Sequence, residues 1–127
     1  MTPQIPRRLW LALLAFLGFG LFQAALTPLD ADEAYYWTYS LLLDWGYFDH
    51  PPMVALWIKA GSVWLAGELG VRLLTVLMMP MTILLIWNLA GKPKNNRQLN
   101  LFLSLFLAMP FFHMYGFIAT PDAPLLF

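Results

Sequence analysis

The chain has 127 residues, of which 61% are hydrophobic, 17% are aromatic and only 11% are charged, whereas a soluble domain carries about 25% charged residues. Seven basic and seven acidic residues give a net charge of zero, so no basic excess indicates nucleic acid as a partner. The absence of cysteine excludes disulfides, thiolate chemistry and cysteine-ligated metals. This is the composition of a membrane protein.

The first apolar stretch follows Arg7 and Arg8 and runs from Leu9 to Leu26 without a charge. A secretory signal peptide has a shorter apolar core, of roughly 7–15 residues, and a small-residue cleavage site. Residues 23–26 (QAAL) match such a site only weakly. We therefore predict a retained transmembrane helix over residues 9–26, ended by Thr27 and Pro28, rather than a cleaved leader.

Residues 30–52 (DADEAYYWTYSLLLDWGYFDHPP) hold five of the seven acidic residues. Asp30 and Glu33 have the offset of a capping box, which predicts a short helix over residues 31–43. Its tyrosine and tryptophan rings, Tyr36 among them, favour the lipid headgroup layer. The diproline at 51–52 keeps the residues before it extended and suits the first turn of a second helix.

That second helix, residues 52–66, is too short to cross a bilayer, which needs about 20 residues. We expect it to lie in the membrane interface, with Lys59 reaching water. Residues 67–70 (GELG) are expected to break the helix. A second span follows over residues 71–90, with Arg72 near its start and Pro80 as a kink.

A basic loop at residues 91–98 (GKPKNNRQ) precedes a third span, predicted over residues 99–118. After a turn at 119–122, an apolar run starts at Ala123 and stops at Phe127. We interpret this run as the start of a fourth span in a truncated chain, and a short frayed tail is the alternative. The expected fold is all-α and integral to the membrane, with an outer loop over 27–70 that carries two juxtamembrane helices.

The distribution of charge predicts the orientation. If residues 53–66 are interfacial, five of the seven basic residues lie on one side of the membrane and all seven acidic residues on the other. If they crossed the membrane, the basic loop would lie opposite the N-terminus, against the positive-inside rule. We therefore place the N-terminus in the cytoplasm, and residues 30–52 with Asp122 on the outer, periplasmic side.

Two groups of acidic residues are candidates for chemistry. Asp32 and Glu33 lie just outside the bilayer, where a carboxylate can act as general base on an acceptor hydroxyl or amine. Helix capping is the simpler alternative for both residues. Asp122 returns to the same side and can converge with Asp32, or it caps the helix that starts at 123, with Pro124 in its first turn.

Asp49 and His50 are held in place by the diproline that follows them. His50 can donate a hydrogen bond to a phosphate, and Lys59 or Arg72 can add positive charge. A solvated turn without a function is the alternative.

Other ionisable residues have simpler explanations. His113 lies in an apolar segment and is expected to be packed or paired, and Glu68 is expected to pair with Arg72, four residues on. Several motifs are absent from the sequence, namely GxxxxGK[ST], GxGxxG, HExxH and GxSxG. Nucleotide-binding loops, a zinc-protease helix and a serine-hydrolase elbow therefore have no support.

Three motifs, DEAYYW at 32–37, GYFDHPP at 46–52 and TPDAP at 120–124, resemble the N-terminal part of bacterial GT-C glycosyltransferases in their order and topology. These membrane enzymes form the glycosyltransferase 39 or PMT-like superfamily, related to protein O-mannosyltransferases and the aminoarabinose transferase of lipid A. The resemblance covers essentially the whole chain, most firmly residues 28–127. It implies a GT-C fold whose first outer loop carries two juxtamembrane helices.

The resemblance also implies roles for single residues. By position, Asp32 would be the catalytic carboxylate, Glu33 its motif partner and Asp122 a second acid near the active site. His50 stands where related enzymes can carry a lysine that meets the donor phosphate. The residues expected to bind substrate are Tyr36, Asp49, His50 and Lys59. No residue is assigned to a metal.

The sequence therefore predicts a glycosyltransferase of the bacterial inner membrane. It would transfer a hexose or pentose from a polyprenyl-phosphate donor to a lipid, glycan or protein acceptor on the outer face. Its partners would be the donor, the acceptor and membrane lipids, with no nucleic acid and no cofactor besides the lipid-linked sugar. The alternative is a small non-catalytic membrane protein that acts as a subunit or a lipid-binding partner.

Overall fold

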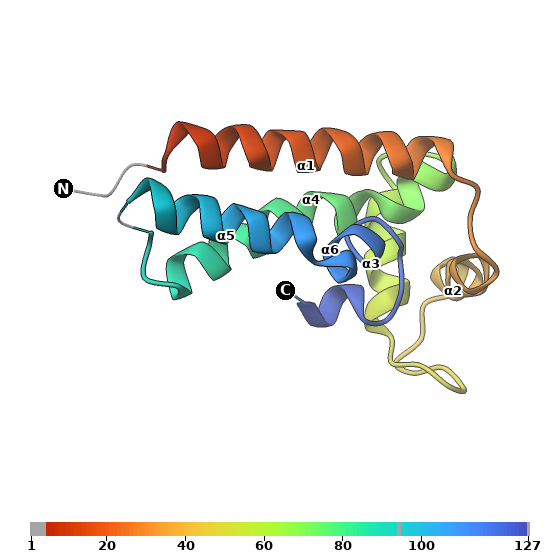
Figure 1. Ribbon diagram of the computed structural model, residues 1–127. Coiled ribbons are helices and arrows are strands. Elements are labelled where there is room, and N and C mark those ends of the chain that lie inside the picture. Colours follow the sequence, from red (N-terminus) through yellow and green to blue (C-terminus); the bar gives the residue numbers. More distant parts are fainter. Residues whose placement is uncertain (1–4, 94, 127) are drawn as a thin grey trace.

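The computed structural model describes residues 5–93 and 95–126. This part of the chain is mostly helical and contains no strand (Figure 1). The all-α expectation is confirmed. The helices are α1 (Arg7–Leu26), α2 (Ala31–Leu41), α3 (Met53–Ser62), α4 (Gly67–Leu89), α5 (Asn96–Ala108), α6 (Pro110–Met114) and the 3-10 helix η1 (Ala123–Leu126).

Two helices, α1 and α4, are long and apolar enough to cross a membrane. At 1.5 Å per residue, their 20 and 23 residues extend over about 30 and 35 Å. They pack closely, because a Cβ atom at Gly20 would lie only 3.1 Å from Cγ1 of Val76. Leu9 and Leu13 of α1 are buried in one core cluster with residues of α4 and α5, including Trp87 and Phe102.

The single helix expected over residues 99–118 is instead divided into α5 and α6. Pro110 is the physical reason, because it lacks an amide hydrogen and its ring clashes with the carbonyl four residues earlier in a continuing helix. The preceding residue, Met109, takes the extended backbone that a following proline favours (φ −87°, ψ 107°). Pro110 then occupies the first turn of α6.

The expected break at residues 67–70 is also corrected, because α4 begins at Gly67 and runs through Gly70. Gly67 has a φ of +74°, which suits glycine at the sharp turn into the helix. A Cβ atom at Gly70 would overlap the carbonyl oxygen of Leu65. These glycines therefore permit a tight connection between α3 and α4 rather than interrupting a helix.

The outer loop forms a separate layer at one end of the long helices. In Figure 1, α1 and α5 lie lengthwise, whereas α2 is seen almost end-on and α3 runs across their direction. At the other end, Arg8 donates a hydrogen bond to Asn100 Oδ1 at 3.4 Å, so the N-terminus of α1 and the start of α5 are adjacent. The arrangement agrees with a basic end and an acidic end, as the charge pattern predicted.

Candidate functional site

Helix α2 begins with the capping box that the sequence predicted. Asp30 is the N-cap, and its backbone N–H donates to Glu33 Oε2 at 3.1 Å. The Asp30 side chain accepts from the backbone N–H of Asp32 at 3.4 Å. The box starts the helix directly in front of the DE motif, which fixes the directions of the two carboxylates at 32 and 33.

Glu33 points inward and forms a buried ion pair with Arg72 of α4. Both side chains are almost inaccessible to solvent, with relative exposures of 0% for Glu33 and 1% for Arg72. Arg72 Nε donates to Glu33 Oε1 at 2.8 Å, and Nη2 donates to Glu33 Oε2. The expected pairing of Glu68 with Arg72 is wrong, because Arg72 faces α1 and α2 while Glu68 is exposed on the solvent side of α4.

A backbone contact from the C-terminal part of the chain also reaches this ion pair. The N–H of Ala119 donates to Glu33 Oε1 at 2.9 Å. Residues 119–122 form the turn that leads into η1 and include Asp122. The DEAYYW motif is therefore joined to the residue that directly precedes the TPDAP motif, although the two motifs are far apart in sequence.

Asp32 and Asp122 have exposed carboxylates, and neither carboxylate makes a hydrogen bond or an ion pair with the described residues. The charges of both carboxylates affect the pKa of the buried Tyr36, which lies one helical turn after Asp32. Burial raises the pKa of the Tyr36 hydroxyl, and the carboxylates of Asp32, Asp49 and Asp122 raise it further. The hydrogen bond from Ala119 to Glu33 places the turn that carries Asp122 next to the start of α2, which carries Asp32.

Asp49 is held by the tyrosines of α2. Tyr39 donates to its Oδ1 at 2.7 Å, and Tyr35 donates to the same carboxylate at 3.2 and 3.3 Å. The Tyr39 hydrogen bond is the main cause that lowers the pKa of Asp49, and His50 lowers it further. The ring of Tyr47 stacks on that of Tyr39 at 4.0 Å, which holds the loop against the helix.

His50 lies between Asp49 and Tyr36. Its Nε2 atom is 3.6 Å from Asp49 Oδ2 and 3.4 Å from the Tyr36 hydroxyl. Three of the four residues expected to bind substrate, Tyr36, Asp49 and His50, therefore form one cluster. The fourth, Lys59, is half-buried on α3 and makes no hydrogen bond or ion pair with the described residues.

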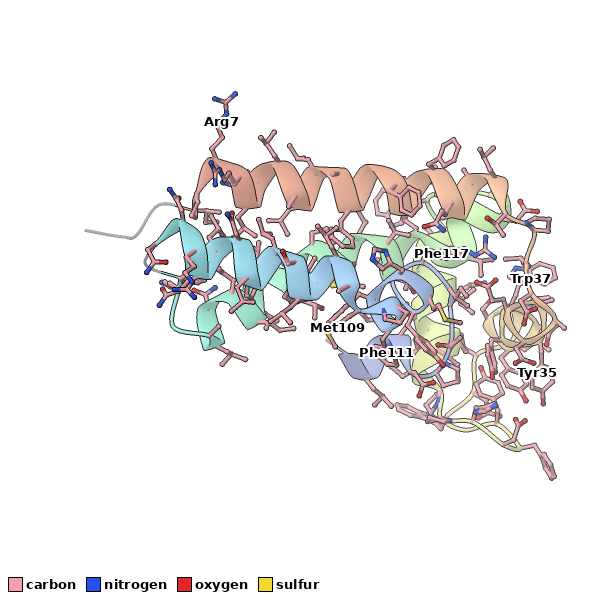
Figure 2. All side chains as sticks on the ribbon, viewed as in Figure 1. Arg7, Tyr35, Trp37, Met109, Phe111 and Phe117 are labelled. Atoms are coloured by element: carbon pink, nitrogen blue, oxygen red, sulfur yellow. The ribbon has the colours of Figure 1, made fainter. Side chains whose placement is uncertain are left out.

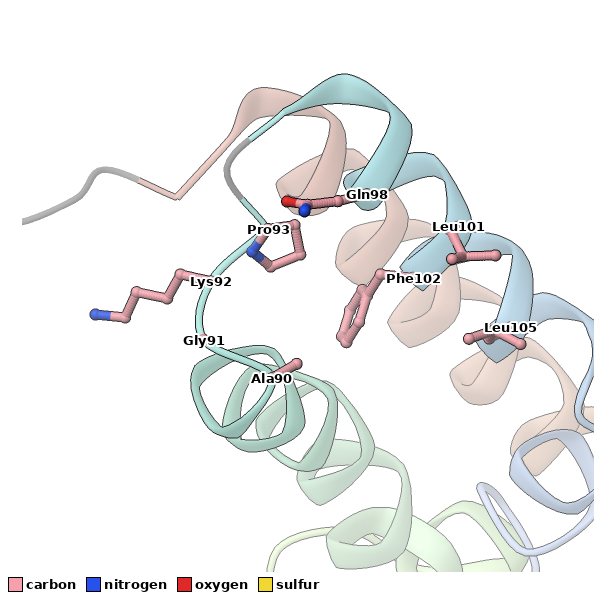
Figure 3. Close-up of a pocket in the computed structure, with 8 residues that line it drawn as sticks. All are labelled: Ala90, Gly91, Lys92, Pro93, Gln98, Leu101, Phe102 and Leu105. Carbon is pink, nitrogen blue, oxygen red and sulfur yellow. The ribbon is translucent and has the colours of Figure 1, made fainter.

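The outward side chains and the basic end are far apart. Figure 2 shows Tyr35 and Trp37 on α2 and Arg7 at the opposite end of the molecule. A groove of about 550 Å³ near that basic end lies between the end of α4 and α5, with Leu101, Phe102 and Leu105 on its wall (Figure 3). Its distance from the acidic cluster excludes it from the candidate site.

The remaining predictions concern histidine and metal binding. His113 stacks on Phe16 with ring centroids 5.4 Å apart, and its Nε2 lies 3.0 Å from the carbonyl oxygen of Leu107, so it is packed and paired as expected. Within the described residues, no three histidine, aspartate or glutamate side chains are placed to hold one metal ion.

Sequence reasoning did not identify the role of Arg72 or the tyrosine pair that holds Asp49. Tyr35 and Tyr39 are four residues apart and therefore share a helix face, a signal that was available. Arg72 and Glu33 are 39 residues apart, and no local pattern relates them.

Comparison with known proteins supports the class of protein that the sequence motifs predicted, a membrane glycosyltransferase of the GT-C type. Residues 49–127 match the family described as dolichyl-phosphate-mannose-protein mannosyltransferase, and the chain belongs to this family. The chain is 41% identical over 61 aligned positions to the lipid A galacturonosyltransferase RgtD of Rhizobium johnstonii, and the alignment covers 44% of the chain. The aligned stretch spans 13% of that relative's length. No solved structure matches the chain significantly.

Proposed function

We propose that this chain supplies the outward-facing catalytic carboxylates of an enzyme that transfers a sugar from a polyprenyl phosphate to an acceptor at the periplasmic face of the bacterial inner membrane. The observation that carries the proposal is a pair of exposed acids, Asp32 and Asp122, whose carboxylates have no partner among the described residues and whose segments are joined by the hydrogen bond from Ala119 to Glu33. Membership of a mannosyltransferase family and similarity to a galacturonosyltransferase support sugar transfer.

In the proposed reaction, Asp32 acts as general base. Its carboxylate takes the proton of an acceptor hydroxyl or amine while the acceptor oxygen or nitrogen attacks the anomeric carbon. The bond between that carbon and the phosphate oxygen breaks, and its electron pair leaves with the polyprenyl phosphate. Because the phosphate is already a stable anion, no acid is needed to protonate the leaving group. A single base is therefore sufficient.

The neighbouring side chains would bind and orient the substrates. His50 donates to the donor phosphate, and its Nε2 atom lies 3.6 Å from Asp49 Oδ2. Asp122 accepts hydrogen bonds from sugar or acceptor hydroxyls, and Tyr36, which stays protonated, can donate to them. Lys59 provides additional positive charge on α3. Glu33, expected to share in catalysis, has no accessible oxygen and does not contact substrate.

The donor class can be tested in membranes that contain the full-length gene product. Labelled sugars would be supplied either on polyprenyl phosphate or as nucleotide sugars, and labelled product would be quantified against membranes that lack the protein. We expect transfer from at least one lipid-linked sugar and none from the nucleotide sugars. Transfer from nucleotide sugars alone, or from no donor in a broad panel, would contradict the proposal and favour the non-catalytic alternative.

A further inference from the structure

We infer that Glu33 and Arg72 are positioning residues, which join α2 to the turn at residues 119–122 so that Asp32 and Asp122 keep a fixed separation. The effect on catalysis rests on the proposed function, whereas the structural link between α2 and the turn at residues 119–122 does not. Four separate segments meet at the ion pair: the end of α1, the start of α2, the first turns of α4 and the turn at residues 119–122.

Arg72 uses its complete hydrogen-bonding capacity. A guanidinium has five N–H donors, and Arg72 makes five hydrogen bonds. Two go to Glu33, and the other three go to backbone carbonyls in the last turn of α1 and directly after it, namely Ala24 at 3.3 Å, Thr27 at 2.6 Å and Pro28 at 3.0 Å. The face of the guanidinium also lies over the ring of Phe117, 5.4 Å from its centroid. No donor is left for a substrate phosphate.

Glu33 is equally occupied. Its carboxylate accepts two hydrogen bonds from Arg72, one from the N–H of Asp30 and one from the N–H of Ala119. The side chain is fully buried. An oxygen enclosed in this way cannot approach an acceptor hydroxyl, so its place beside Asp32 in the sequence does not give Glu33 the same role.

The contact with Ala119 links the two exposed acids. Asp32 and Asp122 are separated by 90 positions along the chain (122 − 32), but the route through the ion pair is short. It runs from Asp32 to Glu33, across one hydrogen bond to Ala119, and then along three residues to Asp122. Ala119 is itself 1% exposed and packs in a cluster with Tyr36 and Ile58, which leaves the turn little room to shift.

Glu33→Gln tests the inference, because glutamine keeps the shape of the side chain and an acceptor oxygen but removes the charge that pairs with Arg72. We expect kcat to fall about 10²-fold, the loss that a displacement of about 1 Å produces, with a smaller change in KM. The pH profile separates the roles. Replacing a positioning residue lowers the maximum of kcat in the pH profile but leaves the fall of kcat at low pH in the same place. Replacing a general base abolishes that fall at low pH.

A second measurement does not depend on activity. The chain contains no cysteine, so spin labels can be placed at Thr38→Cys on α2 and Leu125→Cys in η1, both exposed positions, after replacement of any cysteine outside this chain. We expect a narrow distance distribution in the parent and a broader one in Glu33→Gln and in the milder Arg72→Lys. The control Glu68→Gln removes an exposed charge from the same end and should leave the distribution unchanged.

Each result has one consequence. An unchanged distribution in folded Glu33→Gln, or loss of the fall of kcat at low pH in that variant, would overturn the inference. If the distribution broadens while Asp32→Asn keeps normal turnover, the proposed role of Asp32 fails and the mechanical link between α2 and the turn stands.

Discussion

At the scale of single residues, Asp32 and Glu33 show how a helix gives neighbouring carboxylates different environments. Successive helical residues point about 100° apart, so one acid faces solvent and the other faces Arg72. The buried acid gains four hydrogen bonds, and the exposed acid keeps its lone pairs for a substrate. In the proposed function, the exposed acid of the DE motif is the catalytic group, and the buried acid holds it in position.

Asp49 provides a prediction at this scale. Tyr39→Phe removes the hydrogen bond that chiefly lowers the pKa of Asp49, so that pKa should rise toward its ordinary value of about 3.9. Carbon-13 NMR titration of labelled aspartate carboxyls would measure the change. Tyr115→Phe, which alters a tyrosine packed against Phe111 instead, is the matched control. An unaltered titration in Tyr39→Phe would show that Asp49 is held differently.

The lowered pKa of Asp49 makes the stability of the loop at residues 44–50 depend on pH. The folded-state pKa of Asp49 lies below that of the unfolded chain, so its stabilising contribution is complete above about pH 4. The contribution is lost as the pH falls through the folded value. We therefore expect proteolysis within this loop to become faster below about pH 4, and this acid-dependent increase to be smaller in Tyr39→Phe, because less of the pKa shift remains.

At the scale of elements, the contact between α3 and α4 depends on glycine. A Cβ atom at Gly61 would overlap the carbonyl oxygen of Gly70 and lie 3.2 Å from Cβ of Leu73. The backbones can approach only because neither glycine has a side chain. This close approach places α3, and the loop before it, against the base of the candidate site.

Alanine at Gly61 or Gly70 should therefore destabilise the protein by about 1–3 kcal/mol, the usual cost of inserting a methyl group into a well-packed contact. Gly18→Ala is the control, because a Cβ atom added at Gly18 would have no heavy atom within 4 Å. It should be neutral or stabilising by up to about 1 kcal/mol. Thermal unfolding in detergent would compare the three variants, and equal midpoints would argue against the close contact.

Local signals in the sequence explain which elements could be predicted. The capping box at Asp30 and Glu33 depends on residues three apart, and both its presence and the start of α2 are confirmed. The division at Pro110 was missed because the surrounding residues are continuously apolar, although the proline itself carried the signal. The partner of Glu33 was beyond reach, since an ion pair across 39 residues depends on how α4 packs against α1 and α2.

At the scale of the whole molecule, the two ends differ in charge and the sides are apolar. Helix α1 buries little of its surface, and Leu11, Leu14 and Phe22 are among its exposed side chains. Such a surface suits lipid or further helices. The family to which the chain belongs consists of membrane enzymes, and the acidic end is the one we place outside the cell membrane.

Cysteine labelling tests this orientation. Thr38→Cys on α2 and Asn96→Cys at the start of α5 are both exposed positions at opposite ends. A membrane-impermeant maleimide should label Thr38→Cys in intact spheroplasts and Asn96→Cys only after lysis. The reverse pattern would place the acidic end in the cytoplasm and remove the basis for a periplasmic acceptor.

The central claim is that Asp32 is the base for sugar transfer, and the most direct test is the turnover of Asp32→Asn with a lipid-linked donor in membranes that contain the full-length protein. Glu68→Gln is the matched control, since it neutralises another exposed acid at the same end. We predict that Asp32→Asn loses about 10²–10⁴-fold in kcat while Glu68→Gln stays near the parent. Turnover near that of the parent in a correctly folded Asp32→Asn protein would contradict the account.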